Sequence, residues 1–135
     1  MMTYLLDTSV FSQPLRRKPV MAALTHWRDV GDLTCKVSIV TLAEVEFGLE
    51  LEQNQRRREQ YQHLLLNRLE RVPCDPDIWQ RFARVKARQQ KLGRIVADLD
   101  LLIASTALVF DWTVTTLNHQ DFSKIEGLKW EDWSV

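Results

Sequence analysis

Short apolar runs alternate with longer helical stretches along this chain, and no other feature constrains its fold as much. Residues 3–6, 33–39 and 112–116 are brief and rich in aliphatic or β-branched side chains, which is typical of buried strands. A last short strand is predicted at 128–130. Strands that alternate with helices form a parallel sheet covered on both faces. The sequence therefore predicts an α/β fold with a mainly parallel central sheet of four or five strands.

The segments between the strands have helical periodicity. Helices are predicted over residues 20–30, 41–52, 55–70, 75–93 and 98–110. A chain of 135 residues, with 45% hydrophobic and 27% charged residues, fits one globular domain covering 1–135. The uncharged stretch 101–110 is only ten residues long, whereas a membrane span needs about 20. We therefore expect a single domain with no membrane role.

Cysteine usage and the amino-terminal sequence predict a compartment. Cys35 and Cys74 are too few for a disulfide framework. Asp7 follows a very short apolar run with no basic lead-in, so no signal peptide is recognised. We expect a reduced, cytoplasmic protein.

The zero net charge hides an asymmetry between two parts of the chain. Residues 1–94 carry a net charge of +5, and residues 95–135 carry −5. Six bases and no acid lie between residues 81 and 94. Such a run is either a solvated helix face or a contact for a polyanion. The candidate phosphate contacts within it are Arg84, Arg88 and Lys91.

Asp7 directly follows the first predicted strand. Ligands of α/β proteins bind beyond the carboxyl ends of the strands, so a carboxylate at this position is a candidate for function. An aspartate is equally common as the N-cap that opens a helix. The residues alone leave both interpretations open.

Glu44 lies in a largely apolar helical segment after the second strand. Thr41 and Glu44 have the spacing of a capping box, in which the glutamate bonds back to the cap residue. An acid between Leu42 and Phe47 also suggests a side chain that faces a cleft. Gly48, one turn later, either ends the helix or lets another chain approach closely.

Asp98 and Asp100 open the strongly apolar stretch 98–110. Acids suit the positive end of a helix macrodipole, and this could explain both. One cap is enough for a helix, however, so the second acid needs another explanation. Asp98 is the predicted cap, which leaves Asp100 free to point across the edge of the sheet.

Polar residues also follow the third predicted strand, at Thr116, Asn118 and Asp121. Asparagine and aspartate after a strand are usually turn formers. His119 has no histidine or cysteine partner at a metal-binding spacing, which argues against a zinc site. The glycine-rich patterns of phosphate-binding loops do not occur either.

The acids have one placement in common, because all lie at a strand-to-helix junction or near the start of a helix. In a parallel sheet such positions can converge on one edge. Carboxylates that converge without a cation repel one another and raise some of their pKa values. Hard oxygen ligands of this kind suit Mg²⁺ or Mn²⁺. The residues that would converge are Asp7, Glu44, Asp100, Asn118 and Asp121.

Four motifs in order, together with the C-terminal segment, resemble a known family. They are Asp7-Thr8-Ser9, Ser38-x-x-Thr41-Leu-Ala-Glu44-Val-x-x-Gly48, Asp100-x-x-Ile103-Ala104, Thr116-x-Asn118-x-x-Asp121-Phe122, and Gly127-Leu-x-x-Glu-Asp-Trp133. The arrangement resembles the PIN-domain nucleases over essentially the whole chain. Within them it is most similar to the ribonuclease toxins of VapBC toxin–antitoxin pairs.

The resemblance implies a PIN-like α/β/α sandwich and cleavage of RNA that depends on Mg²⁺ or Mn²⁺. It also implies a homodimer and inhibition by a cognate antitoxin protein. The implied catalytic acids are Asp7, Glu44, Asp100 and Asp121, and the implied metal ligands are these four and Asn118. The fourth acidic position is split between Asn118 and Asp121. The expected supporting residues are Thr8, Ser9 and Thr116, and the expected RNA contacts are Arg84, Arg88 and Lys91.

Three other functions share parts of this pattern. A phosphotransfer enzyme of the haloacid-dehalogenase type also begins with an aspartate after a strand, but it needs a second aspartate where Ser9 stands. A PIN-type RNA-processing nuclease that is not a toxin fits the same motifs. A non-catalytic, partner-binding α/β domain would use the acids only as helix caps.

Overall fold

The computed structural model describes residues 2–135, and a five-stranded sheet forms its centre. The strand order is β3-β2-β1-β4-β5, and every neighbouring pair runs parallel. The strands are β1 (Tyr4–Leu6), β2 (Cys35–Ser38), β3 (Glu70–Val72), β4 (Thr113–Thr116) and β5 (Lys129–Asp132). The predicted parallel α/β sheet is confirmed.

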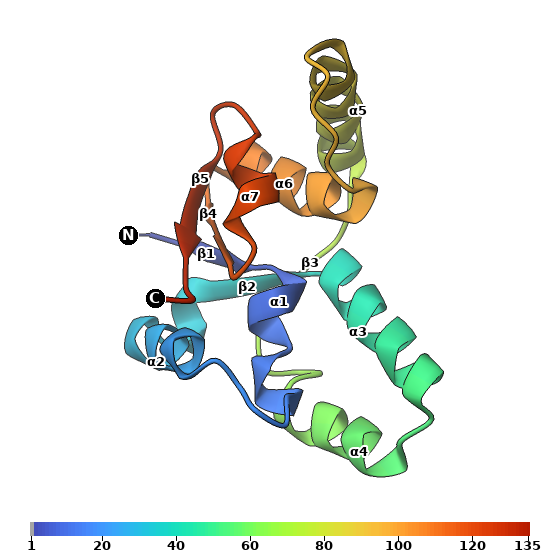
Figure 1. Cartoon of the computed structure of the whole chain (residues 1–135), viewed down its shortest axis with the longest axis vertical. Coiled ribbons are helices and arrows are strands. Elements are labelled where there is room, and N and C mark those ends of the chain that lie inside the picture. The colour runs from blue at the N-terminus through green and yellow to red at the C-terminus, as the bar shows by residue number, and fades with distance from the viewer. Residues whose placement is uncertain (1) are drawn as a thin grey trace.

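Helices cover both faces of this sheet (Figure 1). The α-helices are α1 (Thr8–Phe11), α2 (Met21–Val30), α3 (Ile39–Glu52), α4 (Gln55–Leu64), α5 (Pro76–Lys91), α6 (Asp98–Phe110) and α7 (His119–Ser123). Two short 3-10 helices are η1 (Gln13–Leu15) and η2 (Asp32–Thr34). Within residues 2–135, no helix combines the length and the apolar character that crossing a membrane requires.

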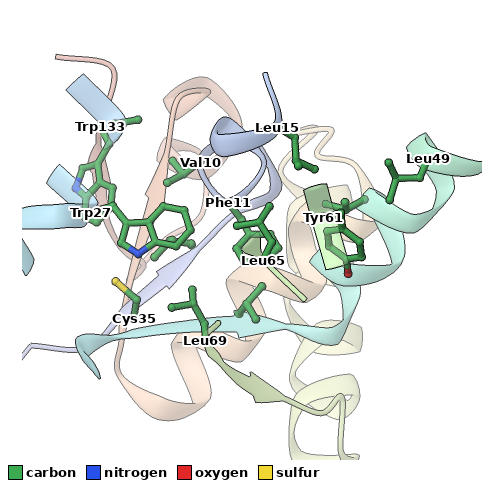
Figure 2. Packing of buried hydrophobic residues seen from close by; sticks show 14 residues of the cluster. Val10, Phe11, Leu15, Trp27, Cys35, Leu49, Tyr61, Leu65, Leu69 and Trp133 are labelled. Atoms are coloured by element: carbon green, nitrogen blue, oxygen red, sulfur yellow. The ribbon is translucent and has the colours of Figure 1, made fainter. Parts of the chain in front are cut away.

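The two faces of the sheet bury separate hydrophobic clusters. Leu5 and Leu6 are both fully buried, and because successive side chains of a strand point to opposite faces, each joins a different cluster. In the Leu6 cluster, Trp27 of α2, Tyr61 of α4 and Trp133 are buried together with side chains of α1 (Figure 2). The Leu5 cluster packs the apolar face of α6 against β4. This double burial makes the short strands almost continuously apolar.

The topology brings several helix starts to one edge of the sheet. β1, β2 and β4 are neighbours, and α1, α3 and α7 begin within three residues of their carboxyl ends. β1 is central: the chain passes from it to β2 and β3 on one side, and then crosses back to β4 and β5 on the other. This reversal of strand order opens a crevice at the carboxyl edge, where α/β folds bind ligands.

The predicted helix over 55–70 is wrong in its second half. α4 ends at Leu64, the chain turns, and β3 forms the edge of the sheet beside β2. Tyr61, Leu65 and Leu69 are all buried, and their four-residue spacing imitates a continuous helix. An exposed edge strand of three residues leaves too little alternation to reveal itself.

Smaller differences concern the ends of elements. The predicted strand over 33–39 is shorter, because η2 occupies its start and α3 begins at Ile39. The residues after β4, whose composition is typical of a turn, form α7. α3 continues through Gly48 to Glu52, so that glycine does not end the helix.

Candidate active site

Asp7 is a helix cap and also a member of the site at the sheet edge. Its side chain is 4% exposed and accepts hydrogen bonds at Oδ1 from the Val10 amide (3.0 Å) and the Ser9 hydroxyl (2.6 Å). The hydrogen bond from the Val10 amide caps α1. Burial raises the pKa of the Asp7 carboxyl; its hydrogen bonds oppose that rise, and the charge of Glu44 adds to it.

Glu44 faces α1 rather than its own helix start. The Thr8 hydroxyl donates a 2.6 Å hydrogen bond to Glu44 Oε1, which joins α1 to α3. The predicted capping box is wrong, because α3 is capped by Ser38, whose hydroxyl accepts from the Val40 amide at 3.0 Å. With the cap supplied by Ser38, three residues before the predicted helix start at Thr41, Glu44 is free to reach across to Thr8.

Asp100 is the acid of α6 that joins the other carboxylates. The N-cap of α6 is Ala97, and Asp98 lies 2.9 Å from the ammonium of Lys86 on α5, so the prediction that Asp98 caps the helix is wrong. The pKa of Asp100 is raised to about 6. Burial is the first cause, and the charges of Asp7, Glu44 and Asp121 add to it.

The fourth acidic position separates into two residues with different surroundings. Asp121 on α7 is partly exposed, and its charge contributes to the raised pKa of Asp100. Asn118 is exposed, and its backbone N–H donates to the Thr116 hydroxyl at 2.8 Å. Asp121 therefore acts electrostatically on Asp100, while ligand roles for Asp121 and Asn118 stay predictions.

The three expected supporting residues hold the acids in place. Thr8 binds Glu44, and the Thr116 hydroxyl lowers the pKa of Asp7. Ser9 makes two contacts, donating to Asp7 and accepting from the Leu117 amide at 3.0 Å. It therefore ties α1 to the segment between β4 and α7, a link between residues 108 positions apart that no local pattern indicates.

The donor set suits a hard divalent cation. Asp7, Glu44, Asp100 and Asp121 offer carboxylate oxygens only, and their mutual repulsion is what a cation would relieve. As the side chains of residues 2–135 stand, no three acidic, histidine or cysteine groups are close enough to hold one ion. The residues fit Mg²⁺ or Mn²⁺ by chemistry, and binding would draw the carboxylates together.

A surface hollow of about 180 Å³ leads away from these acids between α1 and α3. Its lining begins at Thr8 and Glu44 and ends near Arg16 and Arg57. Thr8 was predicted, but sequence reasoning missed Ser12, Leu15 and Arg16 on the α1 side of this hollow. Their sequence spacing from Thr8 is that of one helical face and was the available signal.

Part of the basic run 81–94, most of which lies on α5, is already engaged by partners within the chain. Arg88 forms an ion pair with Glu126 at 2.5 Å, Lys86 pairs with Asp98, and Arg94 donates to the Lys124 carbonyl. Arg84, Arg88 and Lys91 line a shallow hollow on the same helix. RNA contact by these three stays a prediction.

A parallel α/β/α sandwich with acids at its switch point defines the class of protein, and comparison with known proteins identifies the family. The PIN domain family model matches residues 4–128, and the chain belongs to this family. A plasmid stability protein StbB of Pseudomonas syringae pv. tomato is 34% identical over 87% of this chain and 89% of its own.

Relatives of the VapC type match the chain nearly end to end. The tRNA(fMet)-specific endonuclease VapC of Shigella flexneri is 26% identical over 99% of this chain and 100% of its own. The structure of VapBC2 from Rickettsia felis, bound to a DNA fragment from its promoter, has a TM-score of 0.82. It is 26% identical, covering 98% of this chain and 99% of that one. The resemblance to VapC-like PIN domains is confirmed.

Proposed function

We propose that this chain is an endoribonuclease dependent on Mg²⁺ or Mn²⁺ and that it acts as the toxin of a toxin–antitoxin pair. The observation that carries the proposal is the proximity of three acids from distant segments to the partly buried Asp100, whose pKa is raised first by burial and then by the charges of those acids. Such a group is costly to hold together unless a cation binds it. Relatives named as VapC ribonucleases support RNA as the substrate class.

The acids divide by how firmly they are held. Asp7 is buried and fixed by two hydrogen bonds, and Asp100 is held on α6 beside it, so these two would hold the ion. When bound, a divalent cation supplies charge stabilisation at the phosphoryl oxygens and increases the acidity of water. Glu44 and Asp121 would orient the attacking water, with Asn118 as a further oxygen ligand at the rim. Attack by water rather than by the ribose 2′-hydroxyl leaves a 5′-phosphate and a 3′-hydroxyl.

The protein partner would be a cognate antitoxin, bound along α3. Phe47 and Leu51 of α3 are 64% and 69% exposed, and the hollow between α1 and α3 starts at Glu44. A partner seated there would cover the apolar side chains and approach the acids. Solved relatives are VapBC complexes, which supports a protein partner of this kind. We also propose that the chain forms a homodimer.

The first experiment is cleavage of single-stranded RNA by the purified chain, with Mn²⁺, with Mg²⁺ and with EDTA. We expect cleavage with either cation, none in EDTA, and products with a 5′-phosphate. Asp7→Asn should abolish cleavage, whereas the matched variant Asp111→Asn, at an exposed helix end away from the acids, should not. Metal-independent cleavage, or full activity of Asp7→Asn, would contradict the proposal.

A second measurement separates a toxin from an RNA-processing nuclease. Expression of the active chain should arrest bacterial growth, and co-expression of a small protein encoded next to it should restore growth. Cleavage without growth arrest would favour the processing function.

A further inference from the structure

Two aromatic side chains lie stacked and exposed next to the acids. His119 is the first residue of α7, and its ring lies 5.8 Å from that of Trp130 in β5, with 12° between the planes. Atoms of rings in full face-to-face contact are about 3.5–4 Å apart, so rings with this centroid separation are offset and part of each face stays uncovered. Trp130 is 37% exposed, whereas Trp27 and Trp133 are buried.

This pair lies on the elements that carry the candidate active site. α7 packs against β5, and Asp121 follows His119 by two residues (Figure 1). β5 ends at Asp132, which pairs with Thr116 at the carboxyl end of β4. The charge of His119 helps to lower the pKa of Asp132, after the hydrogen bonds from Ser134. The stacked rings therefore border the carboxyl edge of the sheet.

The charges around His119 and Trp130 favour a neutral aromatic ligand over a phosphate. Glu131 and Asp132 directly follow Trp130 in the chain, and residues 95–135 carry a net charge of −5. The two lysines of this part are engaged, because Lys124 lies 3.7 Å from Asp121 and Lys129 lies 3.1 Å from Asp111. A phosphate would be repelled here, whereas a base can stack on an aromatic face without requiring a cation.

We propose that His119 and Trp130 form a stacking platform for one base of single-stranded RNA beside the bond that is cut. The inference rests on the proposed function and adds a positioning contact to it. Because the two rings are already stacked on each other, little freedom is lost when a base joins them. Every base has an aromatic face, so the platform accepts any base and positions the strand without reading its sequence.

The test is the binding of a short fluorescein-labelled single-stranded RNA, measured by anisotropy in chains that also carry Asp100→Asn, so that the RNA stays intact. Trp130→Ala should weaken binding roughly tenfold or more, and Trp130→Phe should retain most of the affinity. Phe110→Ala is the matched control, because Phe110 is 42% exposed and stacks on Trp112 at 4.4 Å. Phe110 and Trp112 precede β4, so they lie at the amino-terminal end of that strand, away from the carboxyl edge of the sheet. The control should therefore bind RNA as the parent does.

A set of RNAs with one abasic nucleotide, moved along the strand, identifies the base. At one position the abasic RNA should bind the parent more weakly, and Trp130→Ala should show no such loss there, because the two changes remove the same contact. If Trp130→Ala melts at a lower temperature than the parent, His119→Ala replaces it in the binding assay, because it removes only an exposed side chain.

The outcomes separate this inference from the proposed function. If the unchanged chain cuts RNA but Trp130→Ala and His119→Ala bind it as the parent does, the platform is wrong and the nuclease stands. If Trp130→Ala loses self-association or antitoxin binding and keeps RNA affinity, the rings form a protein contact and the inference is also wrong. If the unchanged chain neither binds nor cuts RNA, the proposed function itself has failed.

Discussion

Replacement of Asp100 by asparagine should stabilise the metal-free protein. The difference between a pKa of about 6 and the ordinary 3.8 corresponds to about 3 kcal/mol, and solvent screening at a partly exposed carboxylate reduces this to about 1–2 kcal/mol. The neutral amide also loses about 0.3–1 kcal/mol of interaction with the start of α6. The relief of the burial cost and of the repulsion together is the larger effect, so we expect a net gain of about 0.5–1.5 kcal/mol near pH 7.

Thermal melting in EDTA measures this gain, because each kcal/mol shifts the melting temperature of a chain of this length by about 3–5 °C. The gain should depend on pH in a set direction. The folded parent takes up a proton at Asp100 as the pH falls through about 6, whereas the unfolded chain does so only near 3.8. The parent therefore gains stability between pH 7 and pH 4, and the advantage of Asp100→Asn should disappear over that interval.

Cation binding supplies the second half of the test. Mn²⁺ should raise the melting temperature of the parent by mass action, and Asp100→Asn should lose most of that rise and cleave no RNA. Asp98→Asn is the matched control, because it breaks only an exposed ion pair with Lys86 and should cost at most about 1 kcal/mol. The reasoning is refuted if Asp100→Asn is less stable than the parent in EDTA and keeps the full response to Mn²⁺.

Three further changes test neighbouring parts of the site. Ser9→Ala removes a hydrogen bond that lowers the pKa of Asp7, so the acidic limb of the pH–rate profile should move to higher pH and urea unfolding should show a loss of about 1–3 kcal/mol. Gly48→Ala should stabilise α3 by up to about 1 kcal/mol in a thermal melt, because no atom lies within 4 Å of the added Cβ, and it should weaken antitoxin capture. An unchanged complex would show that nothing approaches this glycine. Phe47→Ser combined with Leu51→Ser should change stability by no more than about 0.5 kcal/mol per site and reduce antitoxin binding in a pull-down, since both side chains are exposed.

Much of the fold followed from local pattern. Burial on both faces makes a parallel strand apolar, so β1, β2 and β4 were predicted near their observed positions. α6 was predicted with its observed bounds, because its apolar residues run from end to end. Asp7 stood out for a related reason, since a charge directly after a buried strand must lie at the edge of the sheet. Where burial was one-sided or brief, as in β3, the same logic failed.

The choice among the acids depended on contacts between distant residues. Asp98 and Asp100 occupy one helical turn, and only the position of Lys86 on α5 shows that Asp98 is paired while Asp100 faces the other acids. Thr8 and Glu44 are 36 residues apart, and only the tertiary structure shows that Glu44 accepts from Thr8, while Ser38 supplies the cap that local spacing had suggested at Thr41. The sequence by itself determined most of the buried segments and the acids that lie at their ends, because burial is set by local composition and periodicity. Which side chains meet was decided by the tertiary structure, because the crossover connections place the starts of α1, α3 and α7 at one edge of the sheet.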